Sequence, residues 1–366
     1  MRLRALGGRL GLAVLGVLVV LGVGEIVVRA AGLGPKRFYH PRYVENPWKS
    51  VAIDTYPTNP RGYFDLDLHD PAVNARLTES RLDLGLATQR TPYAVELHYN
   101  EHRCRDHEVV WWPGYTHIVV LGDSFTEGQG VREADTFTRR LERTLQAEGR
   151  KVQIYNCGRR GRDFPELFDA FIELVSSYRP DILVYAMVLN DAVQSPEFRA
   201  EQPFLNDWIL DRRRMVGEEG PDGARGSRLW ALAKDRYESR RVAEATTRWY
   251  IDMYGPRNQA GWDATRHYLE TMKSELDRRD GGKLLVALLP LLVDRRHGYP
   301  FAGPARAIKK ACDDAGISFV DLSDSVAGEP AESLWVHPVD MHPNEKAHAI
   351  FAAALHDAIV SAVEGR

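Results

Sequence analysis

The sequence predicts an α/β fold, a three-layer α/β/α sandwich in which a central parallel sheet of about five strands is covered by helices on both faces. Continuous apolar runs recur along the chain, as expected of strands that are buried on both faces. The segments between the runs show the spacing of amphipathic helices. The expected strands are 117–121 (HIVVL), 151–156 (KVQIYN), 181–188 (DILVYAMV), 283–290 (KLLVALLP) and 317–321 (ISFVD).

Capping patterns indicate where the helices begin. Asp163 and Glu166 form a D-x-x-E pattern ahead of an apolar stripe. Asp135 is a candidate cap for a helix whose apolar face holds Phe137, Leu141 and Leu145. The last helix is expected to start near Pro343, because proline suits the first helical position.

Residues 194–280 interrupt the alternation and are expected to form a helical insert, with a loop at 217–227 (GEEGPDGARGS). Half of the 8 tryptophans fall here, namely Trp208, Trp230, Trp249 and Trp262. Two interpretations are open. The tryptophans anchor insert helices to the core, or they form a rim of aromatic platforms for sugar rings.

With 44% hydrophobic residues, the chain of 366 residues has enough apolar side chains for a large hydrophobic core. A net charge of −3 gives no reason to expect a nucleic-acid partner. The three cysteines, Cys104, Cys157 and Cys312, have neither C-x-x-C nor zinc spacing. Separate buried thiols are the favoured interpretation, and one disulfide with one free thiol is the alternative. The sequence shows no metal cluster or phosphate-binding glycine loop, so no cofactor is expected, and oligomeric state is not indicated.

The N-terminus, residues 1–31, predicts a membrane segment. Basic residues precede an apolar run over 10–28, which is about the length that spans a bilayer. Glu25 interrupts the run near its end, where its carboxylate can reach the interface. We expect an uncleaved, single-pass signal-anchor in the cytoplasmic membrane, with the rest of the chain on the extracytoplasmic side. A cleaved signal peptide and a buried soluble helix are the alternatives.

Residues 32–116 are expected to form a lead-in and accessory region ahead of the main domain at 117–366. Prolines are frequent in 32–75, which favours an extended path, and 76–116 fit short strands and loops.

Polar side chains cluster where the expected strands end. Ser124 follows the first strand, Gly158 and Gly161 follow the second, and Asn190 follows the third. Asp340 and His342 precede the last helix. Because sites in open parallel sheets form at the carboxyl ends of strands, these residues are expected to converge.

This set suits acyl transfer. Ser124 would be the nucleophile, His342 the base that takes its proton, and Asp340 the orienting acid. The oxyanion would be held by the backbone N–H groups of Ser124 and Gly161 and by the Asn190 amide. Gly158 is a competing donor, His337 an alternate base, and a backbone carbonyl an alternate partner for the histidine.

The chain resembles the SGNH (GDSL-type) hydrolases, whose catalytic residues fall in four ordered blocks. The matching stretches are VLGDSFTEGQG, NCGRRG, VLND and DMHPN. The resemblance covers about residues 95–363 and implies a flavodoxin-like fold. It assigns Ser124 and His342 to catalysis, and Ser124, Gly161 and Asn190 to the oxyanion hole.

A membrane-anchored bacterial subgroup is similar in two more stretches. It has E-x-x-x-R after its hydrophobic segment, here EIVVR, and N-x-x-G-F-R upstream of the serine. The second stretch reads NEHRCR here, so Arg103 and Cys104 replace glycine and phenylalanine. Val188 replaces the usual glycine of the third block, and the last block is D-x-H rather than D-x-x-H, which would place the acid at Val339.

The sequence therefore predicts a membrane-tethered serine esterase. It would remove or transfer an O-acyl group, with acetyl the group expected, on a cell-envelope or exopolysaccharide carbohydrate. The alternative is a non-catalytic envelope protein that binds glycan and retains the same fold.

Overall fold

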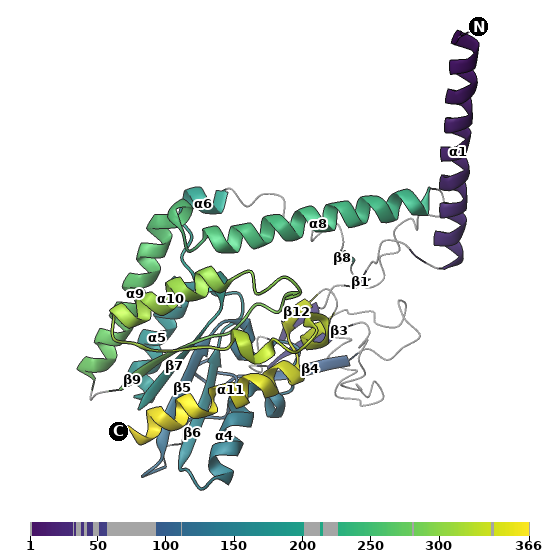
Figure 1. Ribbon diagram of the computed structural model, residues 1–366. Helices are drawn as coiled ribbons and strands as arrows, with labels where there is room; N and C mark the ends of the chain where they lie inside the picture. The colour runs from purple at the N-terminus through teal and green to yellow at the C-terminus, as the bar shows by residue number, and fades with distance from the viewer. Residues whose placement is uncertain are drawn as a thin grey trace.

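A computed structural model describes residues 2–31, 33, 38–39, 42–46, 51–56, 93–110, 112–200, 213–214, 226–279, 282–337 and 340–365. Two features expected from the sequence, Trp208 and most of the loop at 217–227, lie outside these residues. The main sheet is parallel and has five strands in the order β10-β9-β7-β5-β6 (Figure 1). They are β5 (Thr116–Gly122), β6 (Val152–Gly158), β7 (Ile182–Met187), β9 (Lys283–Leu288) and β10 (Ser318–Asp321).

Helices cover both faces of this sheet, which confirms the three-layer prediction. Alternate strand residues feed two apolar clusters, one on each face. One cluster includes α5 (Phe164–Tyr178), α9 (Gln259–Arg278) and α10 (Ala302–Asp314). The other includes α4 (Phe137–Ala147) and α11 (Glu345–Glu364). The strand order, read along the chain as 2-1-3-4-5, places the topological switch point between β5 and β7.

Helix starts agree with the capping patterns in one case and differ in two. Asp163 and Glu166 form the expected capping box of α5. For α4 the cap is Thr136, whose hydroxyl accepts the Arg139 N–H, while Asp135 belongs to the preceding 3-10 turn. For α11 the cap is Asn344, which accepts the N–H groups of Lys346 and Ala347, and Pro343 instead ends a strand. In both cases the cap is a side chain that accepts backbone N–H groups, Thr136 or Asn344, and it lies one residue closer to the helix than the residue expected from the sequence.

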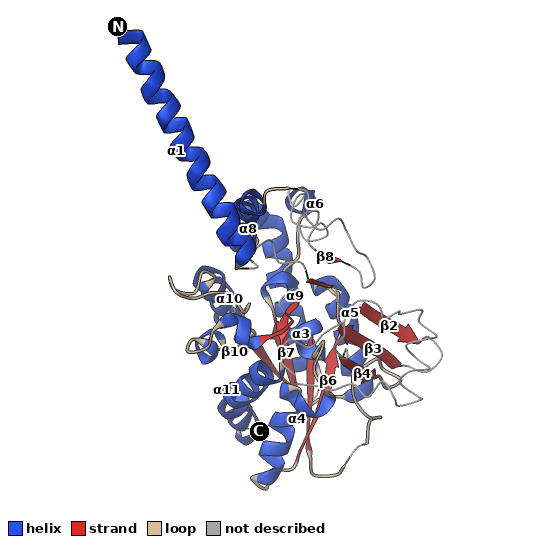
Figure 2. Cartoon of the chain, turned by 90° about the vertical axis from the view of Figure 1, so that its right-hand side faces the viewer, coloured by secondary structure: helices blue, strands red, loops and turns tan. Residues whose placement is uncertain are grey.

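A small antiparallel sheet stands beside the main one (Figure 2). It contains β2 (Arg42–Asn46), β3 (Val51–Tyr56) and β4 (Tyr93–His98), in that order. Two residues of the lead-in, β1 (Phe38–Tyr39), pair in parallel with β8 (Arg213–Arg214). The parts of the lead-in that the structure describes between residues 38 and 56 are extended, and they form paired strands.

The cysteines differ from the favoured expectation of three separate thiols. Cys104 and Cys157 form a disulfide across 53 residues of sequence, and Cys312 is a buried free thiol. A pair this far apart leaves no spacing signal in the sequence, so only the folded chain brings the two sulfurs together.

Among the described residues, three helices lie outside the sandwich or at its rim: α1 (Arg2–Ala30), α6 (Pro196–Ala200) and α8 (Arg228–Asp252). Helix α1 projects away from the body of the protein (Figure 1). Its segment Gly11–Ala30 has a mean hydropathy of 2.5 and is 6% buried, so it is long and apolar enough to cross a membrane. Helix α11 also meets this test by length and composition, but its apolar face covers the main sheet.

The tryptophans of the predicted insert divide between the two interpretations. Trp262 is buried on α9, and Trp249 stacks on Phe198 of α6 with ring centroids 5.9 Å apart. Trp230, near the start of α8, is 70% exposed. Two of them therefore anchor helices to the core, and the third faces solvent.

Candidate active site

Ser124 lies at the first position of a short helix, α3 (Ser124–Glu127), directly after β5. Asp123 caps this helix by accepting the Phe125 N–H at 2.8 Å. Two glycines allow the tight approach of β5, β6 and α3. A Cβ on Gly158 would lie 2.1 Å from the Glu127 nitrogen, and one on Gly122 would lie 2.6 Å from the Ala186 oxygen. The Gly122-Asp123-Ser124 turn is thus a strand end that presents a serine hydroxyl.

The serine hydroxyl contacts a histidine–aspartate pair. His342 Nε2 lies 2.8 Å from Ser124 Oγ, and His342 Nδ1 makes a short contact with Asp340 Oδ1. Both residues belong to β12 (Asp340–Pro343), which pairs with β11 (Trp335–His337) in an antiparallel hairpin. Asp340 is 5% exposed, so its charge acts on the imidazole with little screening by water.

Two further donors hold the Asp340 carboxylate. The His342 backbone N–H donates to Oδ1 at 3.1 Å, and Gln129 Nε2 donates to Oδ2 at 3.0 Å. The partner of His342 Nδ1 is therefore the Asp340 carboxylate, and not the backbone carbonyl that was the alternative. His337 pairs through its backbone with Asp340, and its side chain lies outside the described atoms.

The electrostatics of the pair favour a charged imidazole. Burial lowers the pKa of His342, but the charge of Asp340, its hydrogen bond and the nearby Asp123 together raise that pKa above its ordinary value. A histidine with a raised pKa is a stronger base for a serine proton, and it must be neutral before it can accept one.

Asn190 is also joined to the nucleophile segment. It lies in a 3-10 turn (Leu189–Asp191) after β7, and its Nδ2 donates to Asp123 Oδ2 at 3.1 Å. A carboxamide carries two N–H bonds on this nitrogen, so one remains for a ligand. The next residue, Asp191, is fully buried and accepts bonds from Tyr185 and the Val188 N–H, which fixes the turn.

Gly161 lies in the loop after β6, at the same edge of the sheet, with φ of 69°. This left-handed conformation favours glycine. The competing donor, Gly158, already gives its N–H to Asn156 Oδ1 at 3.1 Å. The structure thus joins Ser124, His342 and Asp340 by hydrogen bonds, binds Asn190 to the adjacent Asp123, and leaves Gly161 as a neighbouring loop residue.

Arg105 is a residue of the site that the sequence interpretation left without a role. Its side chain is fully buried behind α3 and donates to three backbone carbonyls, those of Glu127 at 2.8 Å, Gly128 at 2.8 Å and Val131 at 2.6 Å. These carbonyls end α3 and form the turn that follows, where a cation is favourable. Arg105 therefore fixes the far end of the helix that begins at Ser124.

The NEHRCR stretch explains how Arg105 reaches this position. Asn100 accepts the Cys104 N–H at 3.0 Å and donates to the Tyr178 hydroxyl at 2.8 Å. Arg103 has φ of 58°, a left-handed conformation that favours glycine. Cys104 is buried and bonded to Cys157 at the end of β6. In the sequence, the N-x-x-x-x-R pattern was the feature that could have pointed to Arg105.

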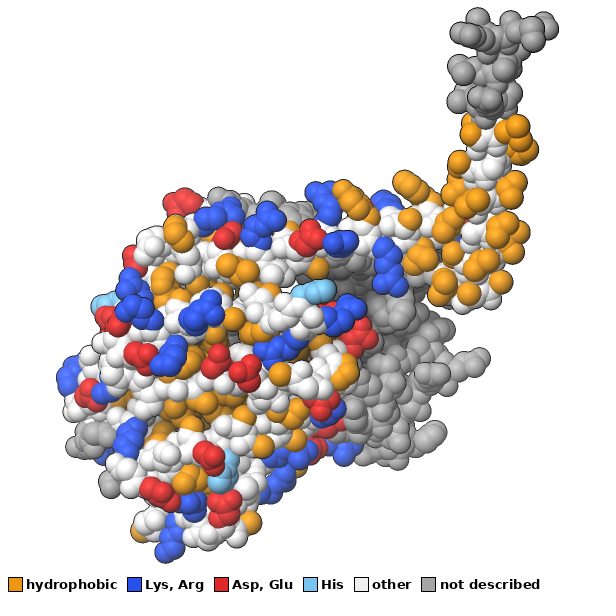
Figure 3. All heavy atoms as spheres, viewed as in Figure 1, with side chains coloured by type: hydrophobic (Ala, Val, Ile, Leu, Met, Phe, Trp, Pro, Cys, Tyr) orange, Lys and Arg blue, Asp and Glu red, His pale blue; other side chains and the backbone are white. Residues whose placement is uncertain are grey.

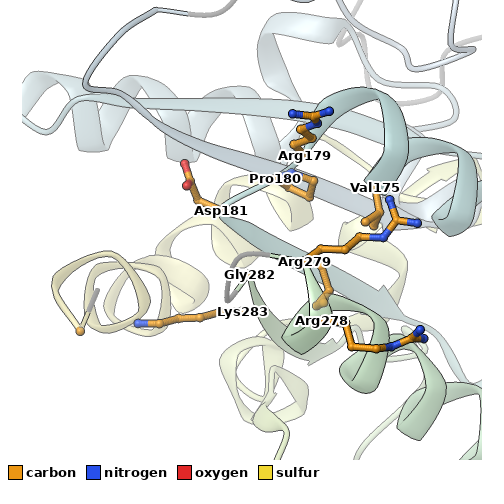
Figure 4. Close-up of a pocket in the computed structure, with 10 residues that line it drawn as sticks. Val175, Arg179, Pro180, Asp181, Arg278, Arg279, Gly282 and Lys283 are labelled. Atoms are coloured by element: carbon orange, nitrogen blue, oxygen red, sulfur yellow. The ribbon is translucent and has the colours of Figure 1, made fainter.

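A cavity of about 870 Å³ lies at the other end of the sheet (Figure 4). It is next to the first residues of β7 and β9 and is lined by Arg179, Asp181, Arg278, Arg279 and Lys283 among others. Arg278 and Arg279 both pair with Glu275, and Lys283 donates to the Ala362 carbonyl at 2.9 Å. The cavity adjoins the amino ends of the parallel strands, whereas Ser124 lies at their carboxyl ends. It is therefore separate from the candidate site.

Together, the fold and the site define the class of α/β enzymes that hydrolyse esters. The profile of the GDSL-like lipase/acylhydrolase family matches residues 120–350, more than half of the chain. The chain belongs to this family, the SGNH hydrolases that the four blocks resemble.

Several solved structures are similar at low identity. The esterase EstA from Pseudoalteromonas sp. is 12% identical with a TM-score of 0.42, covering 68% of this chain and 99% of its own. TesA is 14% identical with a TM-score of 0.41, at 68% and 99% coverage. The acetylxylan esterase Axe2 from Geobacillus stearothermophilus is 13% identical with a TM-score of 0.41, at 67% and 94% coverage. No curated protein sequence matches the chain.

Proposed function

We propose that the protein is a membrane-tethered serine esterase that removes or transfers an O-acyl group, acetyl in the simplest case, on an extracytoplasmic carbohydrate. In this proposal residues 1–31 are the anchor, 32–116 an accessory region, and 117–366 the hydrolase domain. The observation that carries the enzymatic part is the chain of contacts from Ser124 through His342 to Asp340.

The first half of the reaction forms an acyl-serine. Ser124 Oγ attacks the ester carbonyl carbon while its proton passes to His342 Nε2. Asp340 stabilises the resulting imidazolium through Nδ1. The carbonyl oxygen becomes an oxyanion, which the N–H of Ser124, the N–H of Gly161 and the Asn190 amide would hold. When the carbon–oxygen ester bond breaks, His342 returns the proton to the departing sugar oxygen.

The second half regenerates the serine. A water molecule or a second sugar hydroxyl loses its proton to His342 and attacks the acyl carbon. The bond to Ser124 breaks, and Ser124 Oγ takes the proton back. Water gives a free acid and defines a hydrolase, whereas a sugar hydroxyl gives a new ester and defines a transferase.

The location rests on two observations. Glu25 and Arg29 of α1 make hydrogen bonds to residues 226–229, which supports a helix retained in the mature protein rather than a cleaved signal. The Cys104–Cys157 disulfide supports an oxidising compartment, where such bonds persist. The carbohydrate substrate is inferred from the tether, which would hold the domain beside the cell envelope, and from the sequence resemblance to the membrane-anchored subgroup.

Release of p-nitrophenol from its acetate ester by the full chain in detergent micelles tests the activity. Ser124→Ala is expected to lower kcat by roughly 10⁴-fold or more. Ser176→Ala, on the exposed face of α5, is the matched control and should leave the rate unchanged. A fluorophosphonate should label only the peptide that contains Ser124. If Ser124→Ala hydrolysed the ester as fast as wild type, a non-catalytic glycan-binding role would replace the enzymatic one.

A further inference from the structure

The membrane-side end of the structure contains a joint between α1 and α8. Glu25 of α1 accepts the Arg228 N–H at 2.9 Å, the Leu229 N–H at 2.9 Å and the Ser227 hydroxyl at 2.8 Å. Arg29, one turn later, donates to the Gly226 carbonyl at 2.7 Å and to Glu25 at 2.7 Å. Of the two charged residues of the EIVVR stretch, Glu25 therefore binds the first turn of α8 and Arg29 binds the residue before its cap.

This joint satisfies groups that a helix cannot satisfy by itself. The first N–H groups of a helix have no partner within the helix, and a carboxylate placed there is favourable. Here the carboxylate comes from a helix that is about 200 residues distant in sequence. The helices also touch closely, since a Cβ on Gly24 would lie 3.0 Å from Leu229. The start of α8 is thus held next to the C-terminal end of the apolar segment Gly11–Ala30.

Helix α8 runs crosswise to α1, and the free part of α1 extends beyond it on one side (Figure 1). If α1 spans a bilayer, as the proposed function requires, α8 lies along the surface of that bilayer. Figure 3 shows basic and hydrophobic side chains, with some acidic ones between them, along the edge of α8 on the side toward which α1 extends.

One exposed face of α8 has the chemistry of a membrane interface. Trp230, Lys234, Tyr237, Arg241 and Arg248 recur at helical spacing and define what we call the interfacial face. Trp230 is 70% exposed and Tyr237 62%. The Arg241 guanidinium lies 5.7 Å from the centre of the Tyr237 ring. Glu244 also lies on this side and pairs with Arg240.

The opposite side of α8 turns toward the protein. Val242 is buried, and Trp249 stacks on Phe198, so the helix is oriented by its own core contacts. Tryptophan and tyrosine prefer the headgroup level of a bilayer, and lysine and arginine are attracted to anionic lipids. An aromatic face with basic residues and a fixed orientation therefore complements a headgroup layer.

We propose that the interfacial face of α8 rests on the anionic lipid headgroups of the leaflet where α1 ends. This inference rests on the membrane tether of the proposed function. The Glu25–Arg29 joint sets the height of α8, and the interfacial face prevents the domain from rotating away from the surface. The hydrolase domain is consequently held in one orientation above the membrane.

The test uses the full chain, reconstituted in vesicles of phosphatidylcholine and phosphatidylglycerol at about 7:3. A fluorophore on Ala233→Cys, next to the interfacial face, reports its distance from a nitroxide-headgroup lipid. Asp357→Cys, fully exposed on α11, is the matched control. Both variants carry Cys312→Ser to remove the free thiol. We expect at least half of the fluorescence to be quenched at position 233 and almost none at 357.

Charge reversal tests the role of the basic residues. Lys234→Glu with Arg241→Glu should reduce the quenching at 233 severalfold, as should vesicles of phosphatidylcholine alone. Lys309→Glu with Lys310→Glu, on exposed α10, should not.

The outcomes separate the tether from the surface contact. A chain that fails to float with the vesicles contradicts the proposed tether. A chain that floats, with position 233 unquenched, overturns the α8 inference alone. Quenching of 233 that appears only in native membranes, which contain other proteins, assigns the face to a protein partner and also overturns it.

Discussion

The two sides of the Ser124–His342 hydrogen bond are held in different ways. On the serine side, backbone and buried groups surround α3: Asp123 caps it, Asn190 binds that cap, and Arg105 binds the carbonyls at its far end. On the histidine side, the imidazole depends on a single carboxylate, Asp340, which is itself held by Gln129.

This difference predicts different responses to substitution. The serine is positioned by close packing and by bonds to the main chain, so changes there that keep the Asp123 charge should alter geometry and leave the pH dependence intact. The histidine is positioned and charged by Asp340, so changes there should alter the pKa as well as the rate. Three substitutions test this contrast.

Replacing Asp340 with Asn should have the largest effect of the three. The rate constant kcat should fall by roughly 10³–10⁴-fold, because the imidazolium loses its counter-charge. In wild type, kcat/KM should fall as the pH drops through a His342 pKa that lies above its ordinary value of about 6.5. The variant loses the charge that raises this pKa, so its acidic limb should move to lower pH. An unchanged midpoint in a pH–rate profile would contradict the assignment of Asp340.

Replacing Arg105 with Gln should have an intermediate effect. The carbonyls of Glu127, Gly128 and Val131 lose a charged donor, so we expect a loss of about 2–4 kcal/mol in the free energy of unfolding. In the folded variant kcat should fall roughly 10- to 100-fold, because a small displacement of the reacting groups lowers the rate by such factors. KM and the pH midpoint should be unchanged.

Arg103→Gly is the matched control for Arg105. Its left-handed backbone suits glycine, so stability and kcat should be equal to wild type or slightly higher. If the folded Arg105→Gln protein kept its full kcat, Arg105 would be a purely structural cation.

Replacing Gln129 with Ala should have the smallest effect. Asp340 loses one of its hydrogen bonds but keeps its contact with His342. We expect kcat to fall about three- to tenfold, in line with the loss of one hydrogen bond of roughly 1 kcal/mol. Gln259→Ala, at the exposed start of α9, serves as the control. A loss as large as that of Asp340→Asn would mean that Gln129 has a role beyond orienting the carboxylate.

The main sheet and the convergence of the four blocks could be predicted from sequence, because both depend on local signals. Runs such as ILVYAM form strands buried on both faces, and strand ends in a parallel sheet meet at one edge. Ser124, His342, Asp340 and Asn190 were found through this rule and the family blocks.

The rest depends on contacts between distant segments. The N-x-x-x-x-R pattern marks Arg105, but it does not indicate that the acceptors are three carbonyls at and beyond the end of α3. Glu25 was interpreted as a charge tolerated near the end of a membrane span, and nothing local indicated that it also accepts the first N–H groups of a helix that begins at Arg228. The Cys104–Cys157 bond and the small antiparallel sheet likewise arise from long-range pairing.

The disulfide has a consequence for the order in which the enzyme is assembled. It closes a covalent ring, from Cys104 to Cys157, that contains Ser124, Arg105 and the whole of α3. Asp340 and His342 lie outside the ring, near the end of the chain. Because the chain is synthesised from its N-terminus, the ring can close and the serine turn can form before His342 has been synthesised. The nucleophile is complete early, but it stays unreactive until the last segment of the protein arrives.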